Sequence, residues 1–264
     1  MQLRTALNLL ALRSFQVWVG LVLAVLAHLA QAGEVHVAVA ANFTAPMTQL
    51  AAQFEQSTGH KAVVSYGATG RFYAQITNGA PFDVLLSADA AVPARLVLEG
   101  KGVSGSQFTY AAGRLALWSA TPGLVDAQGD VLRRGQFRHV AIAAPLLAPY
   151  GAAAMQALER LGLSAAISPK LVTGESIGQA YTMVATGNAE LGFVALSQVF
   201  AKGKFTGGSA WLVPANLHSP LKQDAVLLLR GQANPAAVAL LAFLKTREVR
   251  AMMTSFGYEV PKAN

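Results

Sequence analysis

The chain has 264 residues, of which 53% are hydrophobic and 12% charged, and its formal net charge is +7. This is enough apolar material for one large globular domain or two domains of ordinary size. The sequence contains no cysteine, which excludes disulfides, thiolate chemistry and zinc sites built on cysteine.

The first 32 residues are typical of a secretory signal peptide. Arg4 and Arg13 make the start basic, residues 15–27 form a continuous apolar run, and Ala30 and Ala32 are the small residues that a signal peptidase reads. The apolar run is shorter than the roughly 20 residues needed to span a bilayer, so a membrane anchor is the weaker alternative. No cysteine follows to carry a lipid. We therefore predict export, with cleavage near Ala32.

The basic residues are scattered rather than clustered. Removing the predicted signal peptide takes away two arginines and lowers the formal charge from +7 to +5. The densest basic spots are Arg133–Arg134 and the pair Lys202 and Lys204, and no aromatic residues are interleaved with them. Such a surface attracts anions mildly and does not favour nucleic-acid binding.

The first part of the exported chain alternates strand-like and helix-like segments. The hydrophobic pattern predicts strands over 34–40, 61–66 and 82–87, with helices over 46–56 and 71–78 between them. Repeated strand–helix units favour parallel pairing with helices on both faces of a sheet, so the predicted fold class is α/β.

A second block of the same kind begins near residue 112. Its predicted strands are 114–119, 139–143, 171–173, 191–196 and 225–229. Its predicted helices are 151–161, the segment that follows Ser176, and one long helix over 235–255.

Four of the predicted helices begin directly after a strand or loop at small, hydroxyl or amide residues with Gly or Pro close by. These helix starts are 40–44, 66–70, 148–151 and 174–178. The first N–H groups of a helix have no partner within the helix, and the helix dipole favours negative charge there. Four such ends brought together would bind an anion without any cation. Any one of them alone is better explained as an ordinary capped helix.

The start at Gly174–Gly178 also spells G-x-S-x-G, the nucleophile elbow of serine hydrolases, with Ser176 as the nucleophile. That fold needs an acid and then a histidine later in the chain. Only His218 and, before it, Glu190 are available, and 88 residues after the serine are too few for the remaining elements. A secreted hydrolase is therefore the weaker alternative.

Four stretches carry a resemblance to a known family: AVAANFTAPM, SYGATGRFYAQITNGAPFDVLLSAD, SPKLVTGESIGQAY and LGFVALSQ. They resemble the periplasmic molybdate-binding proteins of bacterial ABC importers, over essentially all of the exported chain. The resemblance implies a two-lobed periplasmic binding protein of type II, in which each lobe is a mixed, mostly parallel sheet flanked by helices. Lobe I would hold residues 33–110 and 219–264, and lobe II residues 111–218, with an oxyanion in the cleft between them.

The resemblance also implies which groups bind the oxyanion. Asn42 would offer its side-chain amide and its backbone N–H, and Thr69 its hydroxyl. Tyr150 and Ile177 would each offer a backbone N–H. Ala41 would offer a further N–H, in place of a tyrosine hydroxyl that many members have and this chain lacks.

The sequence departs from the family pattern at one position. Many members place a tyrosine hydroxyl in the strand that matches LGFVALSQ, where this chain has Ala195, so one donor is unassigned. Ser176 would then be only a helix-start residue. Glu175, in the same turn, is expected to point outward, as an acid near a helix start commonly does.

A fully ionised tetrahedral oxyanion needs only hydrogen-bond donors, whereas a protonated one such as hydrogen phosphate also favours an acceptor. No Asp or Glu lies in the Asn42, Thr69 or Tyr150 loops, which favours the ionised kind. The expected ligands are molybdate and tungstate, with no cofactor, no direct metal ligand and no enzymatic activity. The expected partner is the membrane permease of an ABC importer, and the protein would act as a periplasmic monomer. A receptor for sulfate or phosphate is the other alternative.

Overall fold

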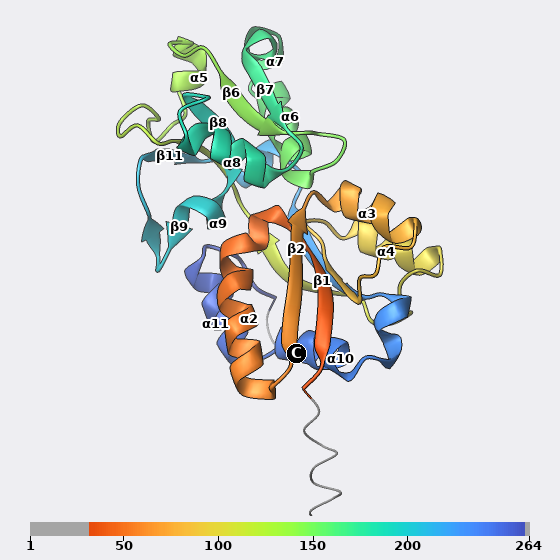
Figure 1. Cartoon of the computed structure of the whole chain (residues 1–264). Helices are drawn as coiled ribbons and strands as arrows, with labels where there is room; N and C mark the ends of the chain where they lie inside the picture. The colour runs from red at the N-terminus through yellow and green to blue at the C-terminus, as the bar shows by residue number, and fades with distance from the viewer. Residues whose placement is uncertain (1–31, 262–264) are drawn as a thin grey trace, which may run out of the picture.

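The computed structural model describes residues 32–261, so the predicted signal peptide lies outside the described residues apart from Ala32. The described chain forms two lobes, each built on a five-stranded sheet (Figure 1). None of the described helices has the length and apolar character needed to cross a membrane.

The first sheet has the strand order β2-β1-β3-β12-β4. Its strands are β1 (Glu34–Ala40), β2 (Lys61–Gly67), β3 (Val84–Leu86), β4 (Phe108–Gly113) and β12 (Leu221–Leu227). The flanking helices are α2 (Thr44–Thr58), α3 (Thr69–Thr77), α4 (Ala91–Leu98), α10 (Pro235–Phe243) and α11 (Arg247–Ser255). The interior strand β1 pairs in parallel with β2 and β3, and β12 runs antiparallel between β3 and β4.

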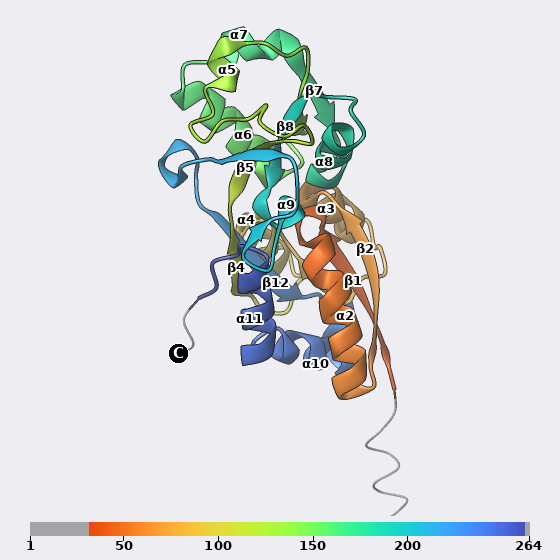
Figure 2. The same ribbon diagram turned by 90° about the vertical axis from the view of Figure 1, so that its left-hand side faces the viewer.

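Alternation along β1 divides the hydrophobic core of this lobe between the two faces of the sheet. Val35, Val37 and Val39 are fully buried on the face covered by α2 and α10. Ala38 belongs to the opposite face, where it packs in the cluster of α3 and α4 that includes Phe72. Figure 2 shows α2 and α11 side by side on one side of the sheet. Both faces of β1 are therefore buried, as expected for an interior strand of an α/β sheet.

The second sheet has the strand order β11-β5-β8-β6-β7. Its strands are β5 (Leu115–Ser119), β6 (Val140–Ala143), β7 (Leu171–Gly174), β8 (Leu191–Ala195) and β11 (Ser209–Leu212). Its helices are α5 (Val131–Arg134), α6 (Pro149–Arg160), α7 (Ser164–Ile167), α8 (Ile177–Ala185) and α9 (Leu196–Val199), and a small hairpin joins β9 (Phe200–Ala201) to β10 (Lys204–Phe205). Short 3-10 turns lie at η1 (Ala41–Phe43), η2 (Ser168–Lys170), η3 (Ala215–Leu217) and η4 (Leu229–Ala233).

The α/β fold with two lobes is confirmed, but parallel pairings are fewer than the sequence predicts. Among the described strands, each five-stranded sheet has two parallel and two antiparallel pairings. The antiparallel pairings involve the strands at which the chain enters or leaves a lobe, β4 and β12 in the first sheet and β5 and β11 in the second. Strand–helix repeats in the sequence predict the parallel pairings of each sheet and not the antiparallel ones.

The predicted helix over 235–255 is wrong, because the segment forms two helices. It breaks after Phe243, and Thr246 begins α11 by accepting a hydrogen bond from the N–H of Val249 to its hydroxyl oxygen, at 3.4 Å. Sequence reasoning also missed β4 and α4.

The chain crosses between the lobes twice. It passes from β4 to β5 at Arg114 and returns between β11 and β12. The predicted lobe boundary at residue 110 falls inside β4, whereas the one at residue 218 falls in the returning segment. At the first crossing Gly113 has no room for a side chain, because a Cβ there would collide with the hydroxyl of Tyr150 and the amide of Gln223.

Candidate functional site

A small cavity of about 10 Å³ lies between the two lobes. All five residues that the sequence predicts as ligands line it. The complete lining is Ala40, Ala41, Asn42, Gly67, Ala68, Thr69, Ala88, Ala148, Pro149, Tyr150 and Ile177. The predicted helix starts are therefore not scattered over the surface, since residues of all four contribute to one cavity.

The first lobe brings Asn42 and Thr69 together through the pairing of two parallel strands. Ala40 is the last residue of β1 and lies opposite Gly67, the last residue of β2. The 3-10 turn η1 and helix α3 start directly after these strands. Because parallel strands end at the same edge of the sheet, the two helix starts lie next to each other, at the place where α/β proteins bind ligands.

The second lobe repeats this arrangement with β6 and β7. Ala143 lies opposite Gly174 in the parallel pairing, and α6 and α8 begin shortly after these two strand ends. Tyr150 is in the first turn of α6 after the cap residue Ala148, and Ile177 is the first residue of α8. Both backbone N–H groups thus belong to the orphan donors of a helix start.

These helix starts leave backbone donors without acceptors at the cavity. Within residues 32–261, the backbone N–H groups of Ala41, Asn42, Thr69, Tyr150 and Ile177 have no hydrogen-bond acceptor. A buried N–H group without an acceptor is rare in folded proteins, because it costs free energy. Five of them around one cavity therefore indicate a ligand that accepts hydrogen bonds.

The hydroxyl of Thr69 adds a sixth donor. Thr69 is almost fully buried, and its Oγ1 accepts a hydrogen bond of 3.0 Å from the N–H of Ala88. The hydroxyl proton then has no acceptor among the described residues and is free to donate.

Formal charge is absent from the lining. No lysine, arginine, aspartate or glutamate within residues 32–261 lines the small cavity. Asp89, next to the lining residue Ala88, lines the larger cavity described below instead. Arg71 and Glu175, each two positions from a lining residue, form an ion pair across the lobes, with 56% and 58% of each side chain exposed. The prediction that Glu175 points away from the cavity is confirmed.

Asn42 is held by a buried polar network that the sequence analysis missed. Its Nδ2 donates to Oε1 of Gln223 and to the hydroxyl of Tyr258, at 2.9 Å each. Gln223 in turn donates from Nε2 to the hydroxyl of Tyr150 at 3.0 Å and accepts at Oε1 from the hydroxyl of Tyr110 at 3.0 Å. Gln223 is fully buried in β12, and no local motif marks it or the tyrosines, because they lie far apart in the chain.

The remaining polar atom of Asn42, Oδ1, is buried and has no hydrogen-bond partner among the described residues. With both hydrogens of Nδ2 used by the network, the amide of this lining residue keeps a free acceptor, in contrast to the free donors described above.

The three phenols of this network stay neutral at ordinary pH. Burial raises the pKa of Tyr150 and of Tyr258 well above that of free tyrosine, and burial together with the neighbouring Tyr258 does the same for the pKa of Tyr110. The cavity and the side chains behind it are therefore uncharged.

The residues that the hydrolase alternative requires are not brought together. Ser176 caps α8, and its Oγ accepts a hydrogen bond of 3.3 Å from the N–H of Gln179, which confirms it as a helix-start residue. The imidazole Nδ1 of His218 contacts the carbonyl of Ser219, at 2.8 Å. The carboxylate of Glu190 accepts from Arg138, and within the described chain no hydrogen bond joins it to His218 or Ser176.

Ala195 offers no donor to the cavity. It is the last residue of β8, is fully buried, and donates its N–H to Oε1 of Gln198 at 2.9 Å. It does not belong to the lining, whereas the N–H of Ala41 does.

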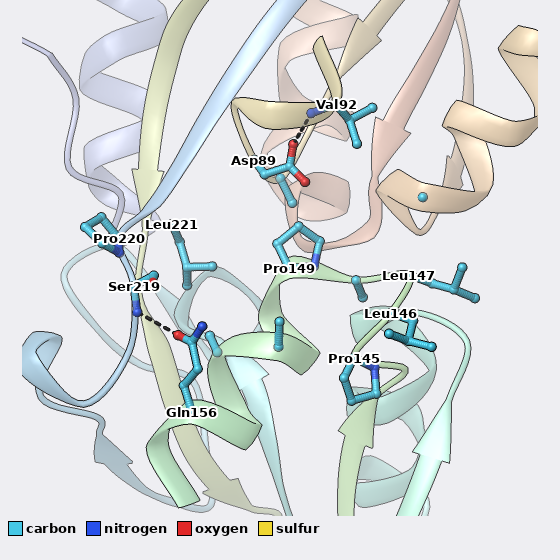
Figure 3. A pocket seen from close by; sticks show the side chains of 15 residues that line it. Asp89, Val92, Pro145, Leu146, Leu147, Pro149, Gln156, Ser219, Pro220 and Leu221 are labelled. Carbon is cyan, nitrogen blue, oxygen red and sulfur yellow. Dashed lines mark hydrogen bonds between the residues drawn. The ribbon is translucent and has the colours of Figure 1, made fainter. Parts of the chain in front are cut away.

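A larger cavity of about 320 Å³ also lies between the lobes (Figure 3). Figure 3 shows Asp89 from the first lobe facing Pro149 of the second, with Leu146 and Leu147 at the rim. Burial raises the pKa of Asp89, although its carboxylate accepts a hydrogen bond of 2.9 Å from the N–H of Val92. A carboxylate among apolar side chains does not suit an anion, so this cavity is not the oxyanion site. No group of His, Asp or Glu that could hold a metal ion occurs in the described chain.

Relatives with known names match over most of the chain. A protein of Azotobacter vinelandii named molybdate-binding protein ModA is 59% identical over 233 residues, which are 88% of this chain and 92% of that protein. A molybdate-binding protein ModA of Rhodobacter capsulatus is 54% identical over 87% of this chain and 89% of its own length.

Solved structures agree with the fold. The periplasmic molybdate-binding protein of Azotobacter vinelandii superimposes with a TM-score of 0.83 at 43% identity, covering 86% of this chain and all of that one. The sulfate-binding protein SubI of Mycobacterium tuberculosis gives 0.68 at 16% identity, covering 86% and 87%, which shows a shared fold alone. The family model for bacterial extracellular solute-binding proteins matches residues 35–259. The chain therefore belongs to the family of bacterial extracellular solute-binding proteins.

Proposed function

We propose that this protein captures molybdate in the small cavity and delivers it to the membrane permease of an ABC importer. The observation that supports this most strongly is the convergence of five free backbone N–H groups and the Thr69 hydroxyl on one uncharged cavity. The names of the relatives that are 59% and 54% identical point to the same ligand.

The chemistry of such a site suits an oxyanion that carries no proton. Every oxygen of molybdate accepts hydrogen bonds, and each bond from a neutral donor to a charged group contributes about 1.5–3 kcal/mol. Several such bonds from both lobes offset the cost of removing water from a dianion. Because the donors are fixed by helix starts, they need no reorganisation when the ligand arrives.

Closure of the lobes would complete the site. The N–H of Gly70 in the first lobe donates to the carbonyl of Leu147 in the second at 2.9 Å, and Arg71 pairs with Glu175 across the same gap. Both contacts form only when the lobes are together. A permease can thereby distinguish the loaded receptor from the open one.

The proposal extends to tungstate, whose size and charge nearly equal those of molybdate. Sulfate has the same charge and needs the same donors, so its rejection would depend on the size of the cavity. Phosphate carries a proton near neutral pH and favours an acceptor such as a carboxylate, and no aspartate or glutamate within residues 32–261 lines the small cavity.

We infer that the protein works in the periplasm as a monomer, after cleavage near Ala32, without a cofactor and without enzymatic activity. The hydrolase alternative predicts ester hydrolysis that Ser176→Ala abolishes. We expect no such hydrolysis in either protein.

Titration calorimetry on the exported chain tests the proposal. We expect tight binding of molybdate and tungstate, and weak or no binding of sulfate and phosphate. Thermal unfolding gives a second readout, because a ligand that binds only the folded state raises its stability by mass action. Sulfate binding as tight as that of molybdate, or no molybdate binding at all, would overturn it.

A further inference from the structure

Among the side chains of residues 32–261, one buried polar atom lacks a hydrogen-bond partner, Oδ1 of Asn42. Oδ1 of Asn42 is an acceptor at the cavity, although an oxyanion requires a donor there. The position of the oxygen and the nitrogen in an amide is an assignment that the hydrogen-bond network decides. The network around Asn42 therefore determines whether the site presents an acceptor or a donor.

Rotating the Asn42 amide alone does not solve the problem. Its oxygen would then face Oε1 of Gln223 across the present 2.9 Å contact, and two acceptors would meet. The Asn42 amide can turn only if the Gln223 amide turns with it.

Turning both amides together retains the contacts that involve them. Nε2 of Gln223 would donate to Oδ1 of Asn42, across the same 2.9 Å, and its second hydrogen would reach Tyr110, now 3.0 Å from Oε1. Tyr110 would give its own proton to the carbonyl of Ser87, which lies 3.1 Å away. Tyr150, which only accepts from Gln223 in the other arrangement, would donate its proton to Oε1.

The paired rotation also changes the unpartnered atom of Asn42 from an acceptor into a donor. Oδ1 of Asn42 would accept from Gln223 and lie within reach of the Tyr258 hydroxyl, and Nδ2 would face the cavity with its hydrogens free. Ser197 can still donate to the carbonyl of Asn42, at 2.7 Å. A buried polar group without a partner costs roughly 1–3 kcal/mol, and the free hydrogens of Nδ2 find acceptors only when an oxyanion enters the cavity, so anion binding favours the rotated pair.

We propose that Gln223 is a positioning residue for the anion site, which holds the Asn42 amide with its N–H toward the cavity by donating to Oδ1 of Asn42. Gln223 does not touch the ligand. It acts through Asn42, and the phenols of Tyr110 and Tyr150 hold Gln223 in turn. The inference rests on the proposed oxyanion site. It adds that Gln223 determines whether the Asn42 amide presents a donor or an acceptor to the ligand.

Nuclear magnetic resonance on the unaltered protein tests this without a substitution at Gln223. The side-chain amide signals of Asn42, assigned as those missing from the spectrum of Asn42→Ala, are followed during titration with molybdate. We expect the Asn42 side-chain protons to move downfield as the anion binds. If molybdate binds and these protons keep their shifts, the proposal fails while the proposed function stands.

A double-mutant cycle gives the energetic test. We expect Gln223→Met, which is similar in length and has no amide, to weaken molybdate binding about tenfold in the unaltered protein. In the Asn42→Ala background, Gln223→Met should not lower molybdate affinity further, because the amide through which Gln223 acts on the ligand is absent. Losses that simply multiply would mean that Gln223 acts independently of Asn42 and would overturn the proposal.

Gln156→Met is the matched control. Gln156 is in α6 near the crossing segment, where its Oε1 accepts a hydrogen bond of 2.8 Å from the N–H of Ser219, and it lines the larger cavity only. The same substitution there should leave molybdate affinity unchanged. Thermal unfolding of each variant checks that it is folded, and the resonance experiment decides the matter should Gln223→Met not fold.

Discussion

The two lobes contribute to the cavity in different ways. The first lobe offers side chains, Asn42 and Thr69, which are anchored by Gln223 and by the N–H of Ala88. The second lobe offers only backbone N–H groups, those of Tyr150 and Ile177 at two helix starts. If the cavity binds an oxyanion as proposed, the side chains that select the ligand lie in the first lobe, and the second lobe supplies backbone donors that do not depend on the identity of its side chains.

The largest expected effect is that of a charge in the first lobe. Asn42→Asp would put a carboxylate beside the anion, and two unit charges about 4 Å apart interact with roughly 4 kcal/mol at an effective dielectric constant of about 20. We expect molybdate affinity to fall at least about a hundredfold in calorimetry at pH 8. Asn42→Ala, which only removes the amide, should cost about tenfold. Equal losses in the two variants would mean that the side chain does not face the ligand.

The Thr69 hydroxyl is the second side-chain donor. Thr69→Val keeps the shape and removes the hydroxyl, so we expect about a tenfold loss of molybdate affinity. It also leaves the N–H of Ala88 without its acceptor, which should cost roughly 1–3 kcal/mol in unfolding free energy. Thr69→Ser restores the hydroxyl and should restore binding. Unchanged affinity in Thr69→Val would remove this group from the site.

The difference between the lobes also explains which parts of the site could be predicted from the sequence. The strand ends and helix starts are local patterns, and they located the residues from 40 to 44, 66 to 70, 148 to 151 and 174 to 178 that meet at the cavity. The motif G-x-S-x-G was ambiguous by itself. The lack of a suitable acid and histidine after Ser176 favoured a helix cap over a nucleophile. The hydrogen bond that the Ser176 hydroxyl accepts from the N–H of Gln179 confirms the cap.

What the sequence could not show is the anchoring of the first lobe. Asn42 and Gln223 are 181 positions apart, and Asn42 and Tyr258 are 216 apart. No local pattern marks any of these residues. Gln223 is placed next to Asn42 by β12, an antiparallel strand whose pairing no strand–helix repeat in the sequence predicts. The prediction of one long helix over 235–255 was wrong because the charged residues within 245–250 were interpreted as the exposed face of a continuous helix, which hid the new start at Thr246.

The second lobe can be tested only through its backbone. Ile177 is the first residue of α8, a position where proline is well tolerated and lacks the N–H. We expect Ile177→Pro to weaken molybdate binding by about tenfold, since it deletes one donor to a charged ligand. Ile177→Val keeps the N–H and loses a single buried methylene, so it should bind normally. An Ile177→Pro variant with unaltered affinity would exclude this donor.

The ion pair between the lobes should matter less than any donor. Arg71 and Glu175 are each more than half exposed, and surface pairs contribute about 0–1 kcal/mol. We expect Arg71→Ala to weaken binding by at most about fivefold, with the difference disappearing at 1 M salt. Arg95→Ala is the control, because Arg95 pairs with Glu99 within the first lobe. A large, salt-independent loss would show instead that Arg71 acts on the ligand.

The smallest expected effect is that of alkaline pH on binding. The anchoring phenols Tyr110, Tyr150 and Tyr258 are buried and have raised pKa values, so the network behind Asn42 stays neutral and molybdate affinity should not change between pH 7 and 9. In the unfolded chain tyrosine ionises near pH 10, so the stability that these phenols contribute is complete below about pH 10. It is lost as the pH rises through their raised folded values.

Alkaline unfolding of the unaltered protein and of Tyr110→Phe therefore separates anchoring from binding. We expect affinity to stay constant until the folded fraction itself falls, because no group that titrates below pH 10 lines the cavity within residues 32–261. The variant, which has one buried phenol fewer, should lose stability less steeply above that pH. A fall in affinity that begins near pH 8, while the protein is still folded, would mean that an ionisable group takes part in binding and that the first lobe does not act through neutral side chains alone.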